Sequence, residues 1–323
     1  MDIDVIIPVY RPGEELKKLL DLLEAQSLKP SRILLINTEK SYFEAAFDED
    51  TLLREHPAVR VYHVTKQQFD HGGTRRSAVR KSEAPIFVMM TQDAIPQDAE
   101  LLERLTKPLR DRMEGRTPAT EPAVAVCYAR QLPGENSSVL ERISRSFNYP
   151  DRSRVKTAAD LDRLGIKTFF CSDVCAAYRR DLYDRLGGFV RKTIFNEDMI
   201  YASAAIRGGY AVRYEAEARV IHAHNYTNLQ QLHRNFDLGV SQVQHPEVFS
   251  GLPSESEGRK LVAYAVKELK AGGEARKIPG FYLQCAFKYL GYQLGKHYRL
   301  LPRKLILRLT TNREYWTDSK ENA

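Results

Sequence analysis

Residues 4–26 read DVIIPVYRPGEELKKLLDLLEAQ and predict one strand followed by one helix. The run at 4–9 is apolar and rich in β-branched residues, which favours a buried strand. In residues 13–26, leucines recur at 16, 19, 20 and 23, and Glu14 and Glu15 stand in the first turn, where the helix dipole favours acids. The chain therefore opens with a strand and a helix, the unit from which α/β sheets are built.

The same alternation continues along the chain. Strand-like runs follow at residues 32–36, 58–64, 86–90 and 123–128, and a helix is predicted at 74–81. Further on, the pattern predicts a turn at Gly187 and Gly188, a helix at 197–207, strands at 211–214 and 218–221, and helices beyond residue 233, while residues 134–154 show no clear pattern. This order predicts an α/β fold with a helical C-terminal extension.

The composition of the 323 residues is that of an ordinary globular protein, with 43% hydrophobic and 28% charged residues. The longest uncharged and mostly apolar stretch, 278–287, has ten residues, whereas a helix needs about 20 to cross a bilayer. The N-terminus carries acids and no basic region, so we expect no signal peptide and a cytoplasmic protein. The four cysteines form no C-x-x-C metal pattern and are expected to be reduced.

Positive charge is concentrated near the C-terminus. Residues 276–313 hold nine Lys or Arg and no acid, so the rest of the chain, from a total of +7, sums to −2. This uneven distribution argues against a nucleic-acid partner. In residues 281–299 the polar positions share one narrow helical face, namely Gln284, Lys288, Gly291, Gly295 and Arg299, and leave a wide apolar face. Such a helix is expected to be half buried.

Leucines 301, 305 and 309 then follow Pro302 on one face of a second predicted helix. The basic, amphipathic C-terminal region fits an anionic membrane surface. The alternative, that these helices pack on the rest of the chain or form a homodimer interface, remains open.

Polar residues follow the predicted strands, where ligands bind in open α/β sheets. Asp93 comes directly after the apolar run at 86–90 and either holds a divalent cation or caps the next helix. Glu197 and Asp198 open a predicted helix, so they are either functional acids or first-turn residues favoured by the dipole. His222 ends a predicted strand and is either a cation ligand or a buried core histidine. The residues alone leave these alternatives open.

Five motifs in order resemble one family. They are VIIPVYRPGEELKKLLDLLEAQ at the start, FDHGGTRR at 69–76, FVMMTQDAIP at 87–96, LGGFVRKTIFNEDMIYASAAIRGGY at 186–210 and VIHAH at 220–224. Together they resemble the family 2 inverting glycosyltransferases of the GT-A fold, and within them the rhamnosyltransferase-like branch. The resemblance implies a nucleotide-sugar-binding mixed sheet flanked by helices, with a catalytic domain at residues 1–232 and a basic, helical membrane- or partner-facing region at 233–323.

The family's metal and base positions transfer to particular residues. Its Asp-x-Asp motif falls on Thr91, Gln92 and Asp93, so the resemblance makes Asp93 a ligand of a divalent cation, Mg²⁺ or Mn²⁺, although the first acid is absent. His222 matches the family's late metal-ligand histidine. Asp198 matches the catalytic base, which removes a proton from the acceptor hydroxyl in a single inverting displacement.

The resemblance also implies a donor-binding set. It comprises Pro8, Tyr10, Asn37, His71, Arg75, Gln92 and Asp93. Asn37 stands where the family usually has an aspartate for the nucleotide base, and Arg76 replaces the asparagine that usually follows the arginine matched by Arg75.

The expected reaction is transfer of a sugar, L-rhamnose from dTDP-L-rhamnose, to a lipid-linked glycan in cell-surface polysaccharide synthesis. The protein would then be peripheral on the inner face of the cell membrane. Two alternatives remain open at this point: a transferase of the same family that uses a UDP-hexose or UDP-galactofuranose donor, and a non-catalytic nucleotide-sugar-binding or membrane scaffold protein.

Overall fold

The computed structural model describes residues 1–252 and 255–317 and contains one mixed β-sheet. The strand order is β3-β2-β1-β4-β8-β6-β9-β5, with β7 beside β9. The strands are β1 (Ile3–Tyr10), β2 (Arg32–Thr38), β3 (Val59–Val64), β4 (Ile86–Met90), β5 (Ile95–Pro96), β6 (Val124–Leu132), β7 (Arg154–Lys156), β8 (Cys175–Arg179) and β9 (Ala211–Ile221). The first four are parallel and β8 is antiparallel to β4, so the sheet is mixed as the GT-A resemblance implies.

The chain divides into two units by its internal contacts. The first comprises Met1–Leu132, Pro150–Lys192 and Glu197–His222, and the second comprises Pro133–Tyr149, Thr193–Asn196 and Ala223–Ala323, so far as these are described. These two units are defined by contacts alone. The functional domains predicted at residues 1–232 and 233–323 stay a prediction.

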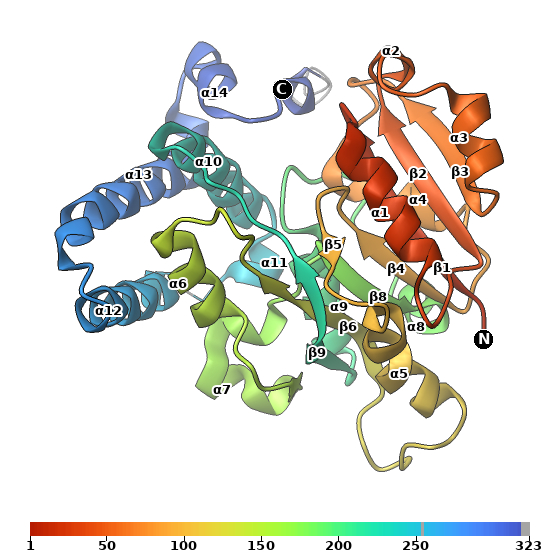
Figure 1. Ribbon diagram of the computed structural model, residues 1–323. Helices are drawn as coiled ribbons and strands as arrows, with labels where there is room; N and C mark the ends of the chain where they lie inside the picture. Colours follow the sequence, from red (N-terminus) through yellow and green to blue (C-terminus); the bar gives the residue numbers. More distant parts are fainter. Residues whose placement is uncertain (253–254, 318–323) are drawn as a thin grey trace. The chain divides into compact units, whose positions relative to one another are not determined.

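Helices of the first unit flank the sheet (Figure 1). They are α1 (Glu14–Glu24), α2 (Lys40–Glu44), α3 (Glu49–Glu55), α4 (His71–Val79), α5 (Leu101–Met113), α7 (Leu161–Leu164), α8 (Arg180–Arg185) and α9 (Glu197–Arg207). The four leucines that recur along α1 are buried with residues of β1 and β2 in the main apolar core. This core positions the ends of the strands, where the candidate site residues lie.

Two boundaries in this unit differ from the sequence prediction for local physical reasons. Helix α4 begins at His71, before the predicted start at residue 74, because the carboxylate of Asp70 accepts a hydrogen bond from the Gly73 amide at 2.7 Å and caps the helix. The two strands predicted at 211–214 and 218–221 form one strand, β9, whose pairing with β6 shifts register between Ala129 and Arg130. The interruption in the sequence is therefore a bulge.

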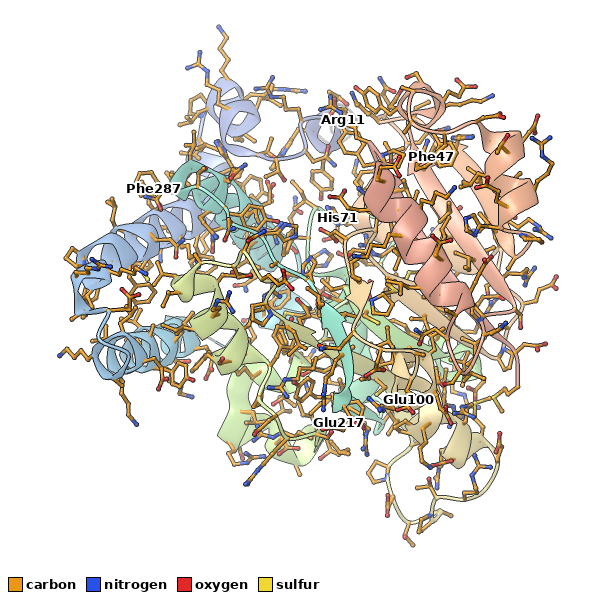
Figure 2. All side chains as sticks on the ribbon, viewed as in Figure 1. Arg11, Phe47, His71, Glu100, Glu217 and Phe287 are labelled. Atoms are coloured by element: carbon orange, nitrogen blue, oxygen red, sulfur yellow. The ribbon has the colours of Figure 1, made fainter. Side chains whose placement is uncertain are left out.

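The second unit is helical. It contains α6 (Val139–Asn148), α10 (Asn228–Gln244), α11 (Pro246–Phe249), α12 (Glu255–Ala271), α13 (Ile278–Lys296) and α14 (Arg303–Leu309). Helix α6 falls in the stretch that the sequence left unassigned. Phe287 of α13, labelled in Figure 2, joins an apolar cluster with Leu232, Phe236 and Val240 of α10. Across the described ranges, no helix has both the length and the apolar character needed to cross a bilayer.

Helices α10 and α13 pack through glycines. A Cβ atom added at Gly291 would overlap the carbonyl oxygen of Leu232, and one added at Gly295 would overlap that of Phe236. The glycine face of α13 is therefore its buried face. One face of α13 is buried, as expected of a half-buried helix. The glycines that the sequence analysis grouped with the polar positions form the contact that lets the two backbones approach.

We expect Gly295→Ala to destabilise the protein by about 1–3 kcal/mol, since a methyl group at this contact forces the helices apart. The effect is measured by thermal unfolding of the parent, of this variant and of a control variant. The control is Gly258→Ala in α12, where a Cβ meets no atom within 4 Å and the better helix propensity of alanine favours a small gain in stability. Equal melting temperatures for the two variants would refute the close-packing account.

Candidate active site

Asp93 and His222 meet at one edge of the sheet, beyond β4 and β9. The Nε2 atom of His222 lies 3.5 Å from Oδ1 of Asp93. His222 is buried, and its backbone N–H donates to the Leu132 carbonyl at 3.0 Å, which fixes the end of β9 beside β6. The Asp93 side chain is 42% exposed and open to a ligand.

Gln131 determines which nitrogen of the neutral His222 ring faces Asp93. The Gln131 amide nitrogen donates to Oγ of Ser172 at 2.8 Å, so its Oε1 is the acceptor for Nδ1–H of His222 at 3.0 Å. In the neutral ring this leaves Nε2 unprotonated on the side of Asp93. Metal sites typically contain such an arrangement: an unprotonated imidazole nitrogen lies beside a carboxylate, and the other ring nitrogen donates to an oxygen acceptor.

Thr91 stands where the family places another acid. Its Oγ1 is buried and has no hydrogen-bond partner among the residues that the structure describes, and its backbone N–H donates to the Val174 carbonyl at 3.1 Å. An unsatisfied buried hydroxyl two residues before Asp93 is consistent with a polar or ionic ligand at this turn. The residues present therefore fit a divalent cation.

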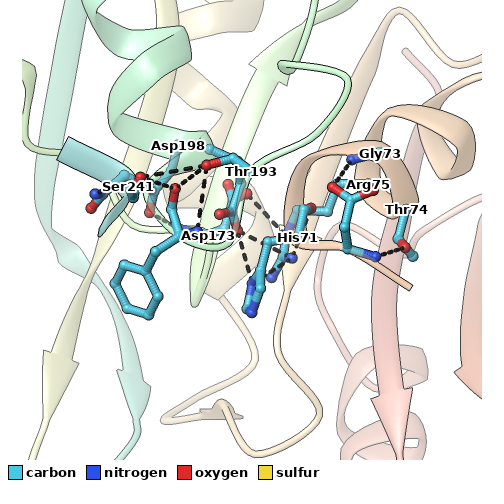
Figure 3. A network of polar contacts seen from close by, with 12 residues as sticks. His71, Gly73, Thr74, Arg75, Asp173, Thr193, Asp198 and Ser241 are labelled. Atoms are coloured by element: carbon cyan, nitrogen blue, oxygen red, sulfur yellow. Dashed lines mark hydrogen bonds and ion pairs between the residues drawn. The ribbon is translucent and has the colours of Figure 1, made fainter. Parts of the chain in front are cut away.

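Arg75 is the centre of a second, buried group of charges (Figure 3). Its Nη1 lies 3.1 Å from Oε1 of Glu197, and its Nε lies 3.2 Å from Oδ2 of Asp173. His71, one turn earlier on α4, has Nδ1 3.7 Å from the same Glu197 oxygen. Arg75 was predicted to face the donor. In the structure these two nitrogens contact carboxylates of the chain itself, Nη1 also donates to the His71 carbonyl at 3.2 Å, and the role of Arg75 in donor binding stays a prediction.

Asp198 is fixed by backbone donors. Its Oδ2 accepts from the Asp173 N–H at 3.2 Å and its Oδ1 from the Met199 N–H at 2.7 Å. Asn196, two residues before it, has a positive φ of 67°, a conformation that asparagine tolerates better than most residues. The backbone therefore turns sharply into α9 and presents two adjacent acids with different partners.

The three carboxyl groups of this cluster have different proton affinities. Burial raises the pKa of Glu197, but Arg75 and His71 outweigh it and hold that pKa at about 2. Burial, only partly offset by Arg75, raises the pKa of Asp173 to about 7. The pKa of Asp198 lies well above its usual range because the group is surrounded by protein and lies near the charges of Glu197 and Asp173. Glu197 is thus the fixed anion, whereas Asp173 and Asp198 both hold a proton more readily than an ordinary aspartate.

A short segment before β8 joins the two groups. Ser172 contacts Gln131, Asp173 contacts Arg75 and Asp198, and the Val174 carbonyl accepts from the Thr91 N–H. Tyr178 of β8 donates to Asp173 Oδ1 at 2.5 Å and further fixes this carboxyl. Asp173, Gln131 and Tyr178 were not identified from the sequence; a lone acid between two cysteines offered no signal, and these contacts appear only in the folded chain.

Asn37, the second-last residue of β2, lies at the predicted nucleotide-base position. Its amide nitrogen lies 3.0 Å from the Glu39 carbonyl oxygen and 2.9 Å from Nδ1 of His63, whose Nε2 lies 2.9 Å from Glu49. With both amide hydrogens engaged, Oδ1 is the remaining acceptor, and it has no partner in the described part of the chain.

The other predicted donor residues surround the end of β1. The Gln92 amide makes two hydrogen bonds to the backbone of Tyr10, at 2.9 and 3.0 Å, and so holds the end of β1 beside the turn that carries Asp93. Pro8 pairs with Ile36 in the neighbouring strand. The Tyr10 ring is exposed and packs edge-on against Tyr42, over which the Arg11 guanidinium lies 4.8 Å away. These residues form an aromatic, positively charged rim, of which Tyr42 was not predicted.

Comparison with known proteins identifies the family of the chain. The family Glycosyl transferase family 2 matches residues 4–187. The chain is 34% identical to the O-antigen chain rhamnosyltransferase RfbN of Salmonella typhimurium, over 98% of this chain and 97% of that protein. It is 33% identical to the O-antigen chain rhamnosyltransferase WbaN of Salmonella anatum, over 97% of this chain and 95% of the relative.

Two solved structures share the fold. The mannosyltransferase PcManGT from Pyrobaculum calidifontis, in complex with GDP-Man and Mn²⁺, has a TM-score of 0.57 at 16% identity and covers 91% of this chain and 86% of its own. S. aureus TarS 1-349 in complex with UDP-GlcNAc has a TM-score of 0.50 at 14% identity, with 93% and 92% covered. The predicted fold and the predicted resemblance to rhamnosyltransferases are both confirmed: the chain is a glycosyltransferase with a GT-A-like fold and belongs to glycosyl transferase family 2.

Proposed function

We propose that this enzyme transfers L-rhamnose from dTDP-L-rhamnose, with inversion, to a lipid-linked glycan acceptor in O-antigen synthesis. The reaction is supported by identity along nearly the whole chain to two proteins named O-antigen chain rhamnosyltransferases. The observation that carries the chemistry is the position of Asp198, held by two backbone N–H groups beside Glu197, which is paired with Arg75.

Asp198 is the proposed general base. The acceptor hydroxyl loses its proton to this carboxylate as its oxygen bonds to C1 of the sugar and the bond from C1 to the diphosphate oxygen breaks. A raised pKa makes the ionised group a stronger base than an ordinary aspartate, and general-base catalysis contributes about 10²- to 10⁴-fold. A single base opposite the leaving group gives inversion, without a covalent sugar intermediate.

Asp93 and His222 are the proposed ligands of Mg²⁺ or Mn²⁺, with Gln131 holding the imidazole in the tautomer that a cation requires. When bound, the cation neutralises charge that develops on the diphosphate as it leaves. The orphaned Thr91 hydroxyl supports a polar ligand at the same turn. Arg11 and Lys66 add positive charge at the rim, where Tyr42 contacts both side chains.

Asn37 is the proposed contact of the nucleotide base. Its amide oxygen is buried and has no partner in the described part of the chain. It is an acceptor that matches the N3–H group of thymine or uracil, whereas cytosine has an acceptor at that position, and a base reaches it only when the side chains that cover it move. Because thymine and uracil share this group, a UDP-sugar donor remains the second candidate. The names of the two close relatives favour the rhamnosyl donor.

The lipid-linked acceptor implies that the enzyme works at the inner face of the cell membrane. The segment 276–313, with nine basic residues and no acid, supports attraction to anionic lipids. The homodimer considered from the sequence is the competing use of that segment, and no nucleic-acid partner is proposed.

We expect Asp198→Asn to lower kcat at least 10²-fold, because an amide cannot accept the hydroxyl proton. The affinity for dTDP should stay within about twofold, since the amide keeps the shape and part of the hydrogen bonding. Release of dTDP from dTDP-L-rhamnose in the presence of a lipid-linked acceptor measures turnover. The control is Asp181→Asn, another first-turn aspartate, which is exposed and pairs with Arg179. Near-normal turnover of Asp198→Asn would exclude Asp198 as the base.

We expect Asp93→Ala and His222→Ala each to reduce the extra thermal stabilisation that Mg²⁺ or Mn²⁺ adds to dTDP, because a ligand that binds only the folded protein raises its melting temperature. The readout is the difference with and without metal, so a lower starting stability of either variant does not obscure it. His245→Ala is the control, since this histidine pairs with Glu247. An unchanged metal-dependent shift in both variants would refute the site, and a stronger response to UDP than to dTDP would favour the second donor.

A further inference from the structure

Helix α13 has an unpartnered apolar face. Tyr282, Leu283, Tyr289 and Leu290 are 51%, 53%, 59% and 51% exposed. Their spacing of one, seven and eight residues from the first places all four on one side of the helix, with the exposed Ala286 between them. This group, which we call the α13 stripe, is the largest set of exposed large apolar residues on any one described helix.

The stripe is held outward by the packing of the opposite side. Gly291 and Gly295 contact α10 so closely that a Cβ atom does not fit. Nearer the start of α13, Phe281 is buried with Ala265 and Leu269 of α12. Rotation of the helix to hide the stripe would therefore break both contacts. The α13 stripe is therefore exposed because contacts with α10 and α12 fix the orientation of the helix.

Basic residues flank the stripe in the sequence. Arg276 and Lys277 precede α13 and share a single carboxylate, that of Glu274. Beyond the helix, Arg299, Arg303 and Lys304 are exposed and have no carboxylate partner within the ranges that the structure describes, and Leu300 beside them is 81% exposed. An apolar helix face flanked by cations without acidic partners is complementary to a lipid bilayer, which has an apolar interior and, where its lipids are anionic, a negatively charged headgroup layer.

We propose that the α13 stripe is the surface by which this enzyme lies on an anionic lipid bilayer. Tyrosine rings suit the headgroup layer, leucines suit the acyl boundary and the flanking cations suit lipid phosphates. A helix of 19 residues is about 28 Å long. It can lie along the membrane interface over this length with only its exposed apolar face in contact with lipid. The inference rests on the proposed membrane-bound acceptor and names the residues that would bring the enzyme to it.

A second copy of the chain fits this surface less well. A two-fold dimer places the same patch on both partners, so the basic ends of one stripe would face those of the other. Without acids in residues 276–313, such a contact would bring like charges together. An anionic bilayer removes this repulsion and makes the same charges favourable.

The test is co-sedimentation of the full chain with vesicles of phosphatidylcholine alone or with phosphatidylglycerol added. The double variant Leu283→Gln, Leu290→Gln should bind the anionic vesicles at least tenfold more weakly. Both side chains are exposed, so folding should be unaffected. The matched control is Val155→Gln, Leu229→Gln, which replaces two other exposed apolar residues and should bind within twofold of the parent. Arg299→Gln, Lys304→Gln should weaken binding to the anionic vesicles only.

Three results would overturn the proposal. The first is unchanged binding of the stripe variant, and the second is equal binding of the parent to neutral and anionic vesicles. The third is a dimer, seen by analytical ultracentrifugation, that the stripe variant dissociates while vesicle binding persists, which would assign the stripe to self-association. With a detergent-dispersed acceptor, the stripe variant should turn over at the rate of the parent. If the parent itself shows no turnover in this assay, that result counts against the proposed reaction and does not affect the vesicle-binding result.

Discussion

The candidate site depends on the ion pairs of the buried Arg75 guanidinium. This guanidinium lies against Glu197 and Asp173, both buried, and a third carboxyl, Asp198, lies beside them. Three acids so close together would repel one another in a medium that solvates charge poorly. Removal of the partner of a buried charge costs about 3–5 kcal/mol. The cation therefore allows α4, the segment before β8 and the start of α9 to meet, and it keeps Glu197 ionised.

The same arrangement connects the two functions of the site. Residues 172–174 reach Gln131 and hence His222 in one direction, and Arg75 and Asp198 in the other. A cation held by Asp93 and His222 and a base at Asp198 would thus be positioned by one short segment. Tyr178 anchors this segment from within β8. A displacement here would be expected to disturb leaving-group stabilisation and proton transfer together.

Much of the fold could be predicted from local pattern, and the rest required contacts that no local pattern reveals. The strand at 86–90 and the helix at 197–207 have the predicted bounds, because an apolar run between prolines and a pair of acids before a helical repeat are local signals. Asp173 and Gln131 were missed because their partners are distant in sequence: Gln131 contacts Ser172 and His222, and Asp173 contacts Arg75. The close contact of α13 with α10 was not predicted because the pattern of polar residues does not show which glycines another helix will approach.

The most direct test of the central claim is the titration of the Asp198 carboxyl carbon by NMR, with its resonance assigned by its absence in Asp198→Asn. Because neighbouring carboxyls titrate together, the same titration in Asp173→Asn separates the two groups. The account predicts a pKa for Asp198 well above the usual value of about 4, and a lower pKa once Asp173 carries no charge. An Asp198 resonance that titrates near 4 in both proteins would contradict the account.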